Sequence, residues 1–299
     1  IEGQQGGRAY IWERTRGLVV KNCKNLDLTI QGGGKDTIVR HGVYRVCNNT
    51  LTKASVANNL VKYNTSSAHI SGLVLHSTMS LLGTASRYNH CTVKVSSSFL
   101  AYLGNISMIN CEFIPETNFS DRYSLSFNNG HLDSYFFKDC KFKGKCRLSN
   151  HNGFFTGTFS NCSFDDVSIQ PNVAANADDL ILFENCDMNY TEDQFIRYSP
   201  HAYSTGDYSQ IKFDSCTITN STNNSTTFVY ANSKPNGYCY FSNCTIALPS
   251  TITIFDGYPS YLENIKDFTI TFENSPLPAD VKLISDKFAT GTPTKINII

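Results

Sequence analysis

A short motif recurs along this chain and limits what it can fold into. The motif is an aromatic residue, any residue, a small polar residue, a cysteine, any residue and an apolar residue. Its clearest copies are residues 137–142, 159–164, 183–188, 213–218 and 241–246, and a last copy at 272–277 has serine in the cysteine position. From Cys91 to Ser275 the copies follow each other at steps of 20 to 31 residues. Repeats of this length, built from short apolar runs, are typical of solenoids.

Each repeat contains three strand-like pieces in which apolar and polar residues alternate, with no helical period. Residues 26–30 show the clean alternation of one such piece. The pattern predicts an all-β fold, a single-stranded parallel β-helix with three short strands per coil and about 9–11 coils. Parallel crossovers are nearly always right-handed, so we expect a right-handed helix.

The repeat also sets the expected domain boundaries. We expect the β-helix to span residues 1–275, with an irregular coil or excursion at 34–67, where the pattern weakens. Residues 276–299 are expected to form a cap or the start of a following domain. Within them, 295–299 is an apolar strand with no obvious partner in the coil, and contact with another subunit is one role for it.

The small polar residue and the cysteine have separate physical roles. Asn tolerates left-handed backbone angles, so we expect it to form a tight corner and to bond to its copy in the next coil. Eight of the 11 cysteines occupy the cysteine position of the motif. Stacked about 4.8 Å apart, they would form a ladder of buried, reduced thiols that act as small hydrophobic groups. This favours folding in a reducing cytosol, and no zinc-site spacing is present.

Composition excludes several classes of function. The 25 basic and 25 acidic residues cancel, so binding to nucleic acid by bulk charge is not expected. No apolar run reaches the length of a membrane span, so we expect no membrane insertion. The sequence begins at Ile1 without a methionine or signal peptide, which suggests an excised fragment or a processed product.

Interior residues of a β-helix are structural, so we expect function on its outer faces or loops. The loop after the first strand of each repeat varies most and would line a groove along one edge of the helix. Amides, carboxylates and aromatic rings suit carbohydrate, which offers hydroxyl groups and C–H faces. The predicted substrate-binding residues are Arg197, Tyr198, His201, Tyr203, Asn152 and His131.

Hydrolysis of a glycosidic bond needs two carboxyl groups about 5 to 9.5 Å apart. Acids one or two coils apart meet this distance, and the predicted catalytic residues are Asp178, Asp187, Asp207 and Glu184. A lyase would instead need a base, and Arg122, Arg147 and Arg197 are candidates for a row of basic residues. We expect no metal site and no cofactor, because neither a carboxylate cluster for Ca²⁺ nor a nucleotide-binding fingerprint is present.

The repeated Asn-Cys pairs give the chain a resemblance to a known family. With pairs at residues 22–23, 110–111, 161–162, 185–186 and 243–244, it resembles the pectate-lyase-like superfamily of right-handed β-helices over about residues 9 to 275. It is most similar to the β-helical bodies of bacteriophage tailspikes and preneck appendages. The resemblance implies a homotrimer in the virion tail, assembled in the host cytoplasm, that binds bacterial surface polysaccharide. Many members cleave it with acids on an outer face or between subunits.

The expected function is therefore that of a tailspike or appendage protein that binds and hydrolyses a bacterial surface polysaccharide. One alternative is a non-catalytic receptor-binding or structural fibre with the same groove. Another is a secreted bacterial polysaccharide lyase or hydrolase, for which the calcium-binding acids and arginine motif of the pectate lyases are not recognisable here.

Overall fold

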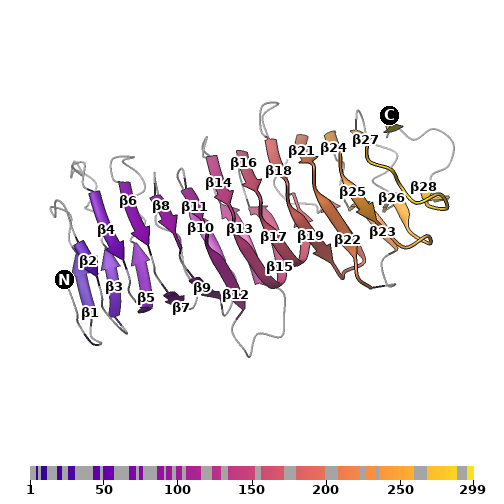
Figure 1. Ribbon diagram of the computed structural model, residues 1–299. Coiled ribbons are helices and arrows are strands. Elements are labelled where there is room, and N and C mark those ends of the chain that lie inside the picture. Colours follow the sequence, from indigo (N-terminus) through magenta and orange to yellow (C-terminus); the bar gives the residue numbers. More distant parts are fainter. Residues whose placement is uncertain are drawn as a thin grey trace.

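The computed structural model is an all-β solenoid whose strands stack in parallel along one axis (Figure 1). It contains no helix in the residues that it describes, which are 5, 8–11, 19–21, 26–30, 43–47, 50–56, 67–71, 74–76, 86–90, 92–95, 99–102, 106–115, 123–128, 134–151, 156–171, 180–198, 208–222, 226–232, 236–258, 268–287 and 295–299. The parallel β-helix predicted from the repeat is confirmed at the level of a β-solenoid.

One parallel sheet, the 12-stranded sheet, contains the strand that precedes each corner. Its strands, in spatial order, are β2 (Val19–Lys21), β4 (Val43–Cys47), β6 (Ser67–Ser71), β8 (Ser86–Asn89), β11 (Ile106–Ile109), β14 (Ser134–Lys138), β16 (Thr156–Ser160), β18 (Leu180–Glu184), β21 (Tyr208–Asp214), β24 (Asn236–Ser242), β27 (Phe268–Glu273) and β29 (Lys295–Ile298).

The other strands belong to the 17-stranded sheet. In chain order they are β1 (Arg8–Ile11), β3 (Leu26–Ile30), β5 (Thr50–Val56), β7 (Val74–His76), β9 (Thr92–Val95), β10 (Phe99–Tyr102), β12 (Glu112–Pro115), β13 (Tyr123–Asn128), β15 (Lys141–His151), β17 (Ser163–Gln170), β19 (Asp187–Tyr190), β20 (Gln194–Tyr198), β22 (Thr217–Asn220), β23 (Thr227–Ala231), β25 (Thr245–Ala247), β26 (Thr253–Gly257) and β28 (Lys282–Ile284).

A coil therefore has three strand segments, two of which share a sheet. In one coil these are β18, β19 and β20, and the next coil repeats them as β21, β22 and β23. In β15 and β17 the two segments after the corner merge into one continuous strand. The predicted division into three pieces is thus present, with the break after the second piece lost in these two coils.

The corner between the two sheets has the backbone conformation expected of the small polar residue. All the non-glycine residues with positive φ in the described part occupy this motif position, with φ between 46° and 55°: His90, Asn110, Asp139, Asn161, Asn185, Ser215, Asn243 and Asn274. Two of these side chains also bond to their copy in the neighbouring coil. Asn161 Nδ2 donates to Asp139 Oδ1 (3.2 Å), and Asn274 Nδ2 donates to Asn243 Oδ1 (3.3 Å).

The left-handed backbone at Asn185 gives a first testable prediction. Replacing Asn185 (φ 50°) with valine should destabilise the fold by about 1–2 kcal/mol, because a β-branched side chain clashes with the backbone in this region. Asn185→Gly, which removes the side chain without this clash, serves as the control and should stay close to wild type. Urea denaturation followed by circular dichroism measures both, and equal stability of the two variants would contradict the role given to the corner.

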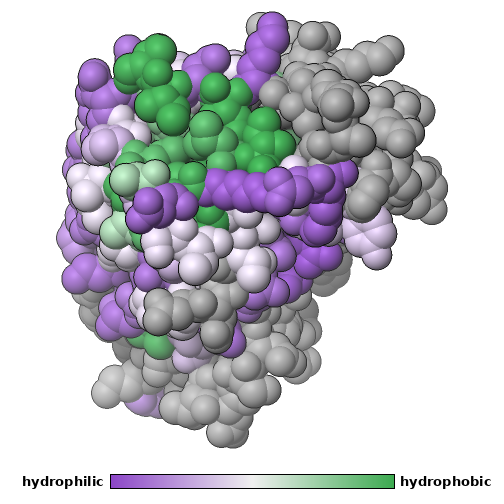
Figure 2. Space-filling view, turned by 90° about the vertical axis from the view of Figure 1, so that its right-hand side faces the viewer, coloured by the Kyte–Doolittle hydropathy of each residue, from purple (hydrophilic) through white to green (hydrophobic). Residues whose placement is uncertain are grey.

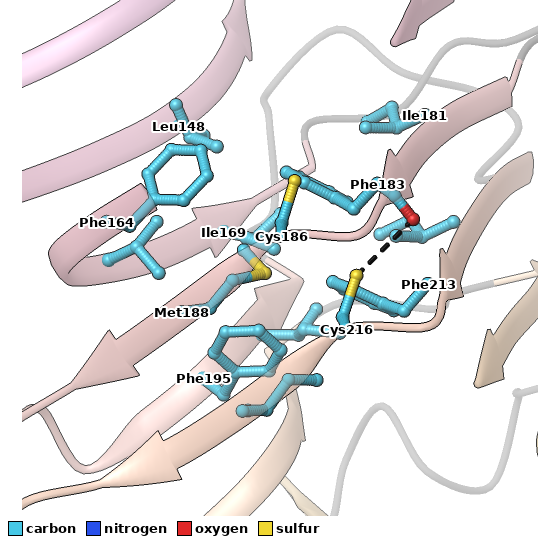
Figure 3. Packing of buried hydrophobic residues seen from close by; sticks show 14 of the residues in the cluster. Leu148, Phe164, Ile169, Ile181, Phe183, Cys186, Met188, Phe195, Phe213 and Cys216 are labelled. Carbon is cyan, nitrogen blue, oxygen red and sulfur yellow. Dashed lines mark hydrogen bonds between the residues drawn. The ribbon is translucent and has the colours of Figure 1, made fainter. Parts of the chain in front are cut away.

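Stacked phenylalanines fill much of the interior (Figure 3). The aromatic residue of the motif forms a continuous column in which consecutive rings are nearly parallel and 4.7 to 5.0 Å apart, from Phe137 through Phe159, Phe183, Phe213 and Phe241 to Phe272. A second column, Phe113–Phe142–Phe164, begins at the apolar end of the motif. The register that aligns these rings also aligns every outward-facing position between them.

Beside the phenylalanine columns runs the predicted ladder of thiols. The eight cysteines whose side chains the structure describes are buried and free, and six of them occupy the motif position. Each of these six donates to a backbone carbonyl of the preceding coil, as Cys216 Sγ does to Phe183 O (3.5 Å; Figure 3). Ser275 continues the ladder and donates to Phe241 O (3.3 Å). The prediction of reduced, buried thiols is confirmed for these eight cysteines.

Burial should make these thiols unreactive in the native protein. It raises the pKa of the Cys239 thiol to about 12, and a hydrogen bond to the adjacent thiol together with burial raises the pKa of Cys140 and Cys216 to about 12. Because a reagent has little access to a buried thiol, we expect a disulfide reagent at pH 8 to titrate at most the three remaining cysteines before unfolding and all 11 in denaturant. Rapid titration of most cysteines in the folded protein would contradict the ladder.

Two segments in which the sequence pattern weakens contain strands that pair within the sheets. Within residues 34–67, β4 and β5 pair in parallel with the strands before and after them. Residues 295–299 do find a partner inside the coil, because β29 pairs with β27 in register and Ile298 lies opposite Phe272. The expectation that this strand lacks a partner in the coil is therefore wrong.

The C-terminal end of the solenoid carries an apolar patch (Figure 2). Ile298 and Ile299 are exposed large hydrophobic residues at this end, with Ile298 54% and Ile299 70% exposed. Ile298 follows the phenylalanine column in register but has no described strand beyond it. The patch is thus the uncovered end of the interior columns.

Candidate functional site

The structure describes only part of the site predicted from the sequence. Six of its residues lie outside the described residues: Asp178, Asp207, His201, Tyr203, Asn152 and His131. The other four, Glu184, Asp187, Arg197 and Tyr198, are described and lie in three different environments.

Glu184 and Asp187 lie on either side of one corner. Glu184 ends β18 in the 12-stranded sheet, the corner residue is Asn185, and Asp187 begins β19 in the 17-stranded sheet. Asp187 is exposed and lies opposite Ser163 of the preceding coil, as predicted. The two acids therefore belong to different sheets, and each has its nearest register neighbours on its own side of the corner.

Tyr198 and Arg197 are adjacent in β20 but face opposite sides. Tyr198 is fully buried, and its hydroxyl lies 3.1 Å from Cys239 Sγ. This interior position takes Tyr198 out of reach of a ligand on the outer surface, contrary to its predicted contact with substrate. Arg197 is half-buried on the outside and lies opposite Tyr230 of the next coil.

The arginines do not form the row that a lyase would need. Arg147 lies opposite Ser168, and in the next step Ile169 lies opposite Ile196. Ser168 therefore lies opposite Phe195, so the row that contains Arg147 reaches Phe195 and not Arg197. Arg122 lies outside the described residues.

A row of acids that sequence reasoning missed runs along the 12-stranded sheet. It consists of the residue just before each corner, and from β14 onward its members, in register across successive coils, are Lys138, Ser160, Glu184, Asp214, Ser242 and Glu273. We call Glu184, Asp214 and Glu273 the acid row. All three are partly exposed on the outer face, while the phenylalanine before each of them is buried.

Lys212 places a positive charge beside the central acid. Its Nζ lies 3.4 Å from Asp214 Oδ2 and 5.7 Å from the centre of the Tyr240 ring in the next coil. Asp214 Oδ1 accepts a hydrogen bond from Ser215 Oγ (3.1 Å). Partial burial acts to raise the pKa of Asp214, but the Ser215 bond and the charge of Lys212 outweigh it and hold that pKa below its usual value. Asp214 is therefore a carboxylate that stays ionised.

Two tyrosines of β24 complete the polar surface. Tyr240 donates its hydroxyl proton to Glu273 Oε2 (2.5 Å), and this bond raises the pKa of Tyr240. Tyr238 donates to Gln210 Oε1 (2.7 Å). Both rings are partly exposed, and they are held in place by hydrogen bonds between adjacent coils.

The spacing of the acid row suits carboxylate chemistry. Glu184 and Asp214 are direct neighbours on adjacent strands, whose backbones lie about 4.8 Å apart, so their carboxyl groups can approach to a similar separation. Retaining glycosidases hold their two carboxyl groups about 5–5.5 Å apart, and inverting enzymes about 6.5–9.5 Å. Asp214 and Glu273 are two strands apart, but the Glu273 carboxylate is occupied by Tyr240.

The signal for this row was present in the motif. The second position of the motif, directly after the aromatic residue, can be any residue. In the copies at 183–188, 213–218 and 272–277 it is Glu184, Asp214 and Glu273, respectively. The fixed distance of this residue from the corner is what places the acids in register.

The described residues hold no group of three or more histidine, cysteine, aspartate or glutamate side chains that could bind a metal ion. In the same part of the chain, no helix is long and apolar enough to cross a membrane. Comparisons with protein-family models, with curated proteins and with solved structures found no significant match.

Proposed function

We propose that this chain binds a bacterial surface polysaccharide along the outer face of the 12-stranded sheet and hydrolyses it at Glu184 and Asp214. The observation that carries the proposal is the direct register of these two acids beside Lys212 and Tyr240. A solenoid face repeats every coil, so it offers a polymer a series of similar contacts along one axis. Aromatic rings and carboxylates that are fixed in place suit sugar rings and hydroxyls.

The environments of the two acids suggest their roles. Asp214, held ionised by Lys212 and Ser215, attacks the anomeric carbon and forms a glycosyl ester. Glu184, the register neighbour of Asp214, is the carboxyl group that remains for the second role, which is to protonate the departing glycosidic oxygen. It then takes a proton from the water that cleaves the ester, which restores both acids.

A panel of bacterial capsular and lipopolysaccharide glycans tests this proposal. We expect release of reducing ends from at least one glycan that the protein retards in affinity electrophoresis, without ultraviolet absorbance from unsaturated sugars. Absorbing products would favour a lyase. Binding without any product would leave a receptor-binding fibre, the alternative that the same face also suits.

The tailspike assignment is a further part of the proposal and rests on the resemblance of the repeat to tailspike β-helices. It includes a homotrimer in a virion tail. Light scattering coupled to size-exclusion chromatography should give three times the chain mass of 33.3 kDa, and a monomer would favour a secreted enzyme.

A further inference from the structure

A second polar cluster lies on the 17-stranded sheet, away from the acid row. It consists of Arg197 on β20, Tyr230 on β23, Asp256 on β26, Tyr258 and Lys287, and we call it the Arg197 cluster. Arg197 lies opposite Tyr230, and Tyr230 lies opposite Asp256, so three successive coils contribute to one row. Lys287 joins from the chain after β28, with Nζ 2.8 Å from Asp256 Oδ2.

The charges of the cluster do not cancel. Asp256 is buried, and its two oxygens are taken by Lys287 Nζ and by the Gly257 backbone N–H (2.7 Å). Arg197 has no carboxylate partner among the described residues, and its Nε is buried without a hydrogen-bond acceptor there. The positive charge of Arg197 is therefore not neutralised on the outer face. Among the described residues, no acceptor takes a hydrogen bond from its N–H groups.

Two tyrosines beside Arg197 could also contact a ligand: Tyr230 offers a hydrogen-bond donor, and Tyr258 offers an exposed aromatic ring. Burial and the charge of Asp256 raise the pKa of Tyr230, against the opposing charges of Lys287 and Arg197, so its phenol stays a proton donor. Tyr258 is 56% exposed and lies close enough to contribute to the same shift. An arginine fork binds a carboxylate through two parallel hydrogen bonds, and an exposed ring stacks on the C–H face of a sugar.

We propose that the Arg197 cluster binds a carboxylate-bearing sugar, such as a uronic acid residue of an acidic polysaccharide. The acid row, with three carboxylates against one lysine, does not suit such a group, so the cluster is a separate subsite. This proposal identifies the class of glycan that the chain binds. It does not depend on whether the acid row hydrolyses that glycan.

Binding of hyaluronate, in which every second sugar carries a carboxylate, tests the cluster. Affinity electrophoresis in hyaluronate gels, with neutral dextran gels as reference, gives an apparent dissociation constant for each variant. We expect Arg197→Gln to weaken binding about tenfold, the loss of one charge-assisted interaction, and Tyr258→Ala to weaken it too. Lys141→Gln, which removes the same charge from an exposed site on another coil, should bind like the wild type.

Several outcomes would overturn the proposal. These are no retardation by hyaluronate, equal retardation of wild type and Arg197→Gln, or equal loss in Lys141→Gln, which would indicate bulk charge alone. Undiminished binding to carboxyl-reduced hyaluronate would also overturn it. Release of reducing ends is measured separately, so failure here leaves the acid row standing, and an inactive acid row leaves this subsite standing.

Discussion

Replacing Phe213 with alanine is expected to destabilise the fold by about 3–5 kcal/mol, the usual cost of removing a buried phenylalanine ring. Phe213 is fully buried and stacks between Phe183 at 5.0 Å and Phe241 at 4.7 Å. Its loss would leave a cavity in the longest column of the interior, where each coil is covered only by its two neighbours.

Urea denaturation of the Phe213 variant measures this cost. Thr245→Ala, at an exposed position of β25, is the control and should stay within about 0.5 kcal/mol of wild type. A loss below about 1 kcal/mol for Phe213→Ala would mean that the column does not hold adjacent coils together.

Asp214→Asn and Glu184→Gln are each expected to lower the rate of polysaccharide hydrolysis by about 10²–10⁴-fold, the range typical of a positioned acid or base. Both changes keep the size of the side chain; Asp214→Asn removes the nucleophilic carboxylate, and Glu184→Gln removes the group that exchanges a proton. Because neither residue belongs to the interior columns, we expect both variants to unfold at wild-type urea concentrations.

Asp187→Asn is the matched control for these variants. Asp187 lies two residues after the corner residue Asn185, on the other sheet, exposed and out of the acid row. It should keep wild-type activity. Loss of activity in Asp187→Asn, with Asp214→Asn unaffected, would move the catalytic acids to the other side of the corner.

The sequence predicted the interior because the motif acts directly on the backbone. A small polar residue that must adopt positive φ fixes the corner, and the aromatic two positions earlier and the cysteine that follows are then forced inward. Asn185, Phe183 and Cys186 meet these expectations together. The same reasoning carries through the worn copy at Asn274 and Ser275.

The candidate site was harder to predict because it depends on register between coils. Glu184 and Asp187 are close in sequence, but the corner turns the two onto different sheets. Its register neighbour is Asp214, 30 residues later, across a connection whose length differs from repeat to repeat. Distance from the corner, and not distance along the chain, decides which side chains meet.

Tyr198 shows a second limit of the sequence pattern. It ends β20 in a segment where three consecutive residues, from Gln194 to Ile196, do not alternate strictly, since Phe195 and Ile196 are both buried. A loss of alternation at this point reverses which of Arg197 and Tyr198 faces out. The sequence predicted a tyrosine-rich surface at this point. In the structure, only Arg197 of the pair Arg197 and Tyr198 lies on the outer face.

The stereochemistry of the first product tests the paired acids most directly. Proton NMR during the first minutes of cleavage distinguishes the anomer released by the enzyme before it equilibrates in water. Neighbouring coils place Glu184 and Asp214 about one strand spacing apart, so we predict retention of configuration. Inversion would require a wider pair, such as Asp214 with Glu273, and would contradict the assignment of Glu184 and Asp214 as acid and nucleophile.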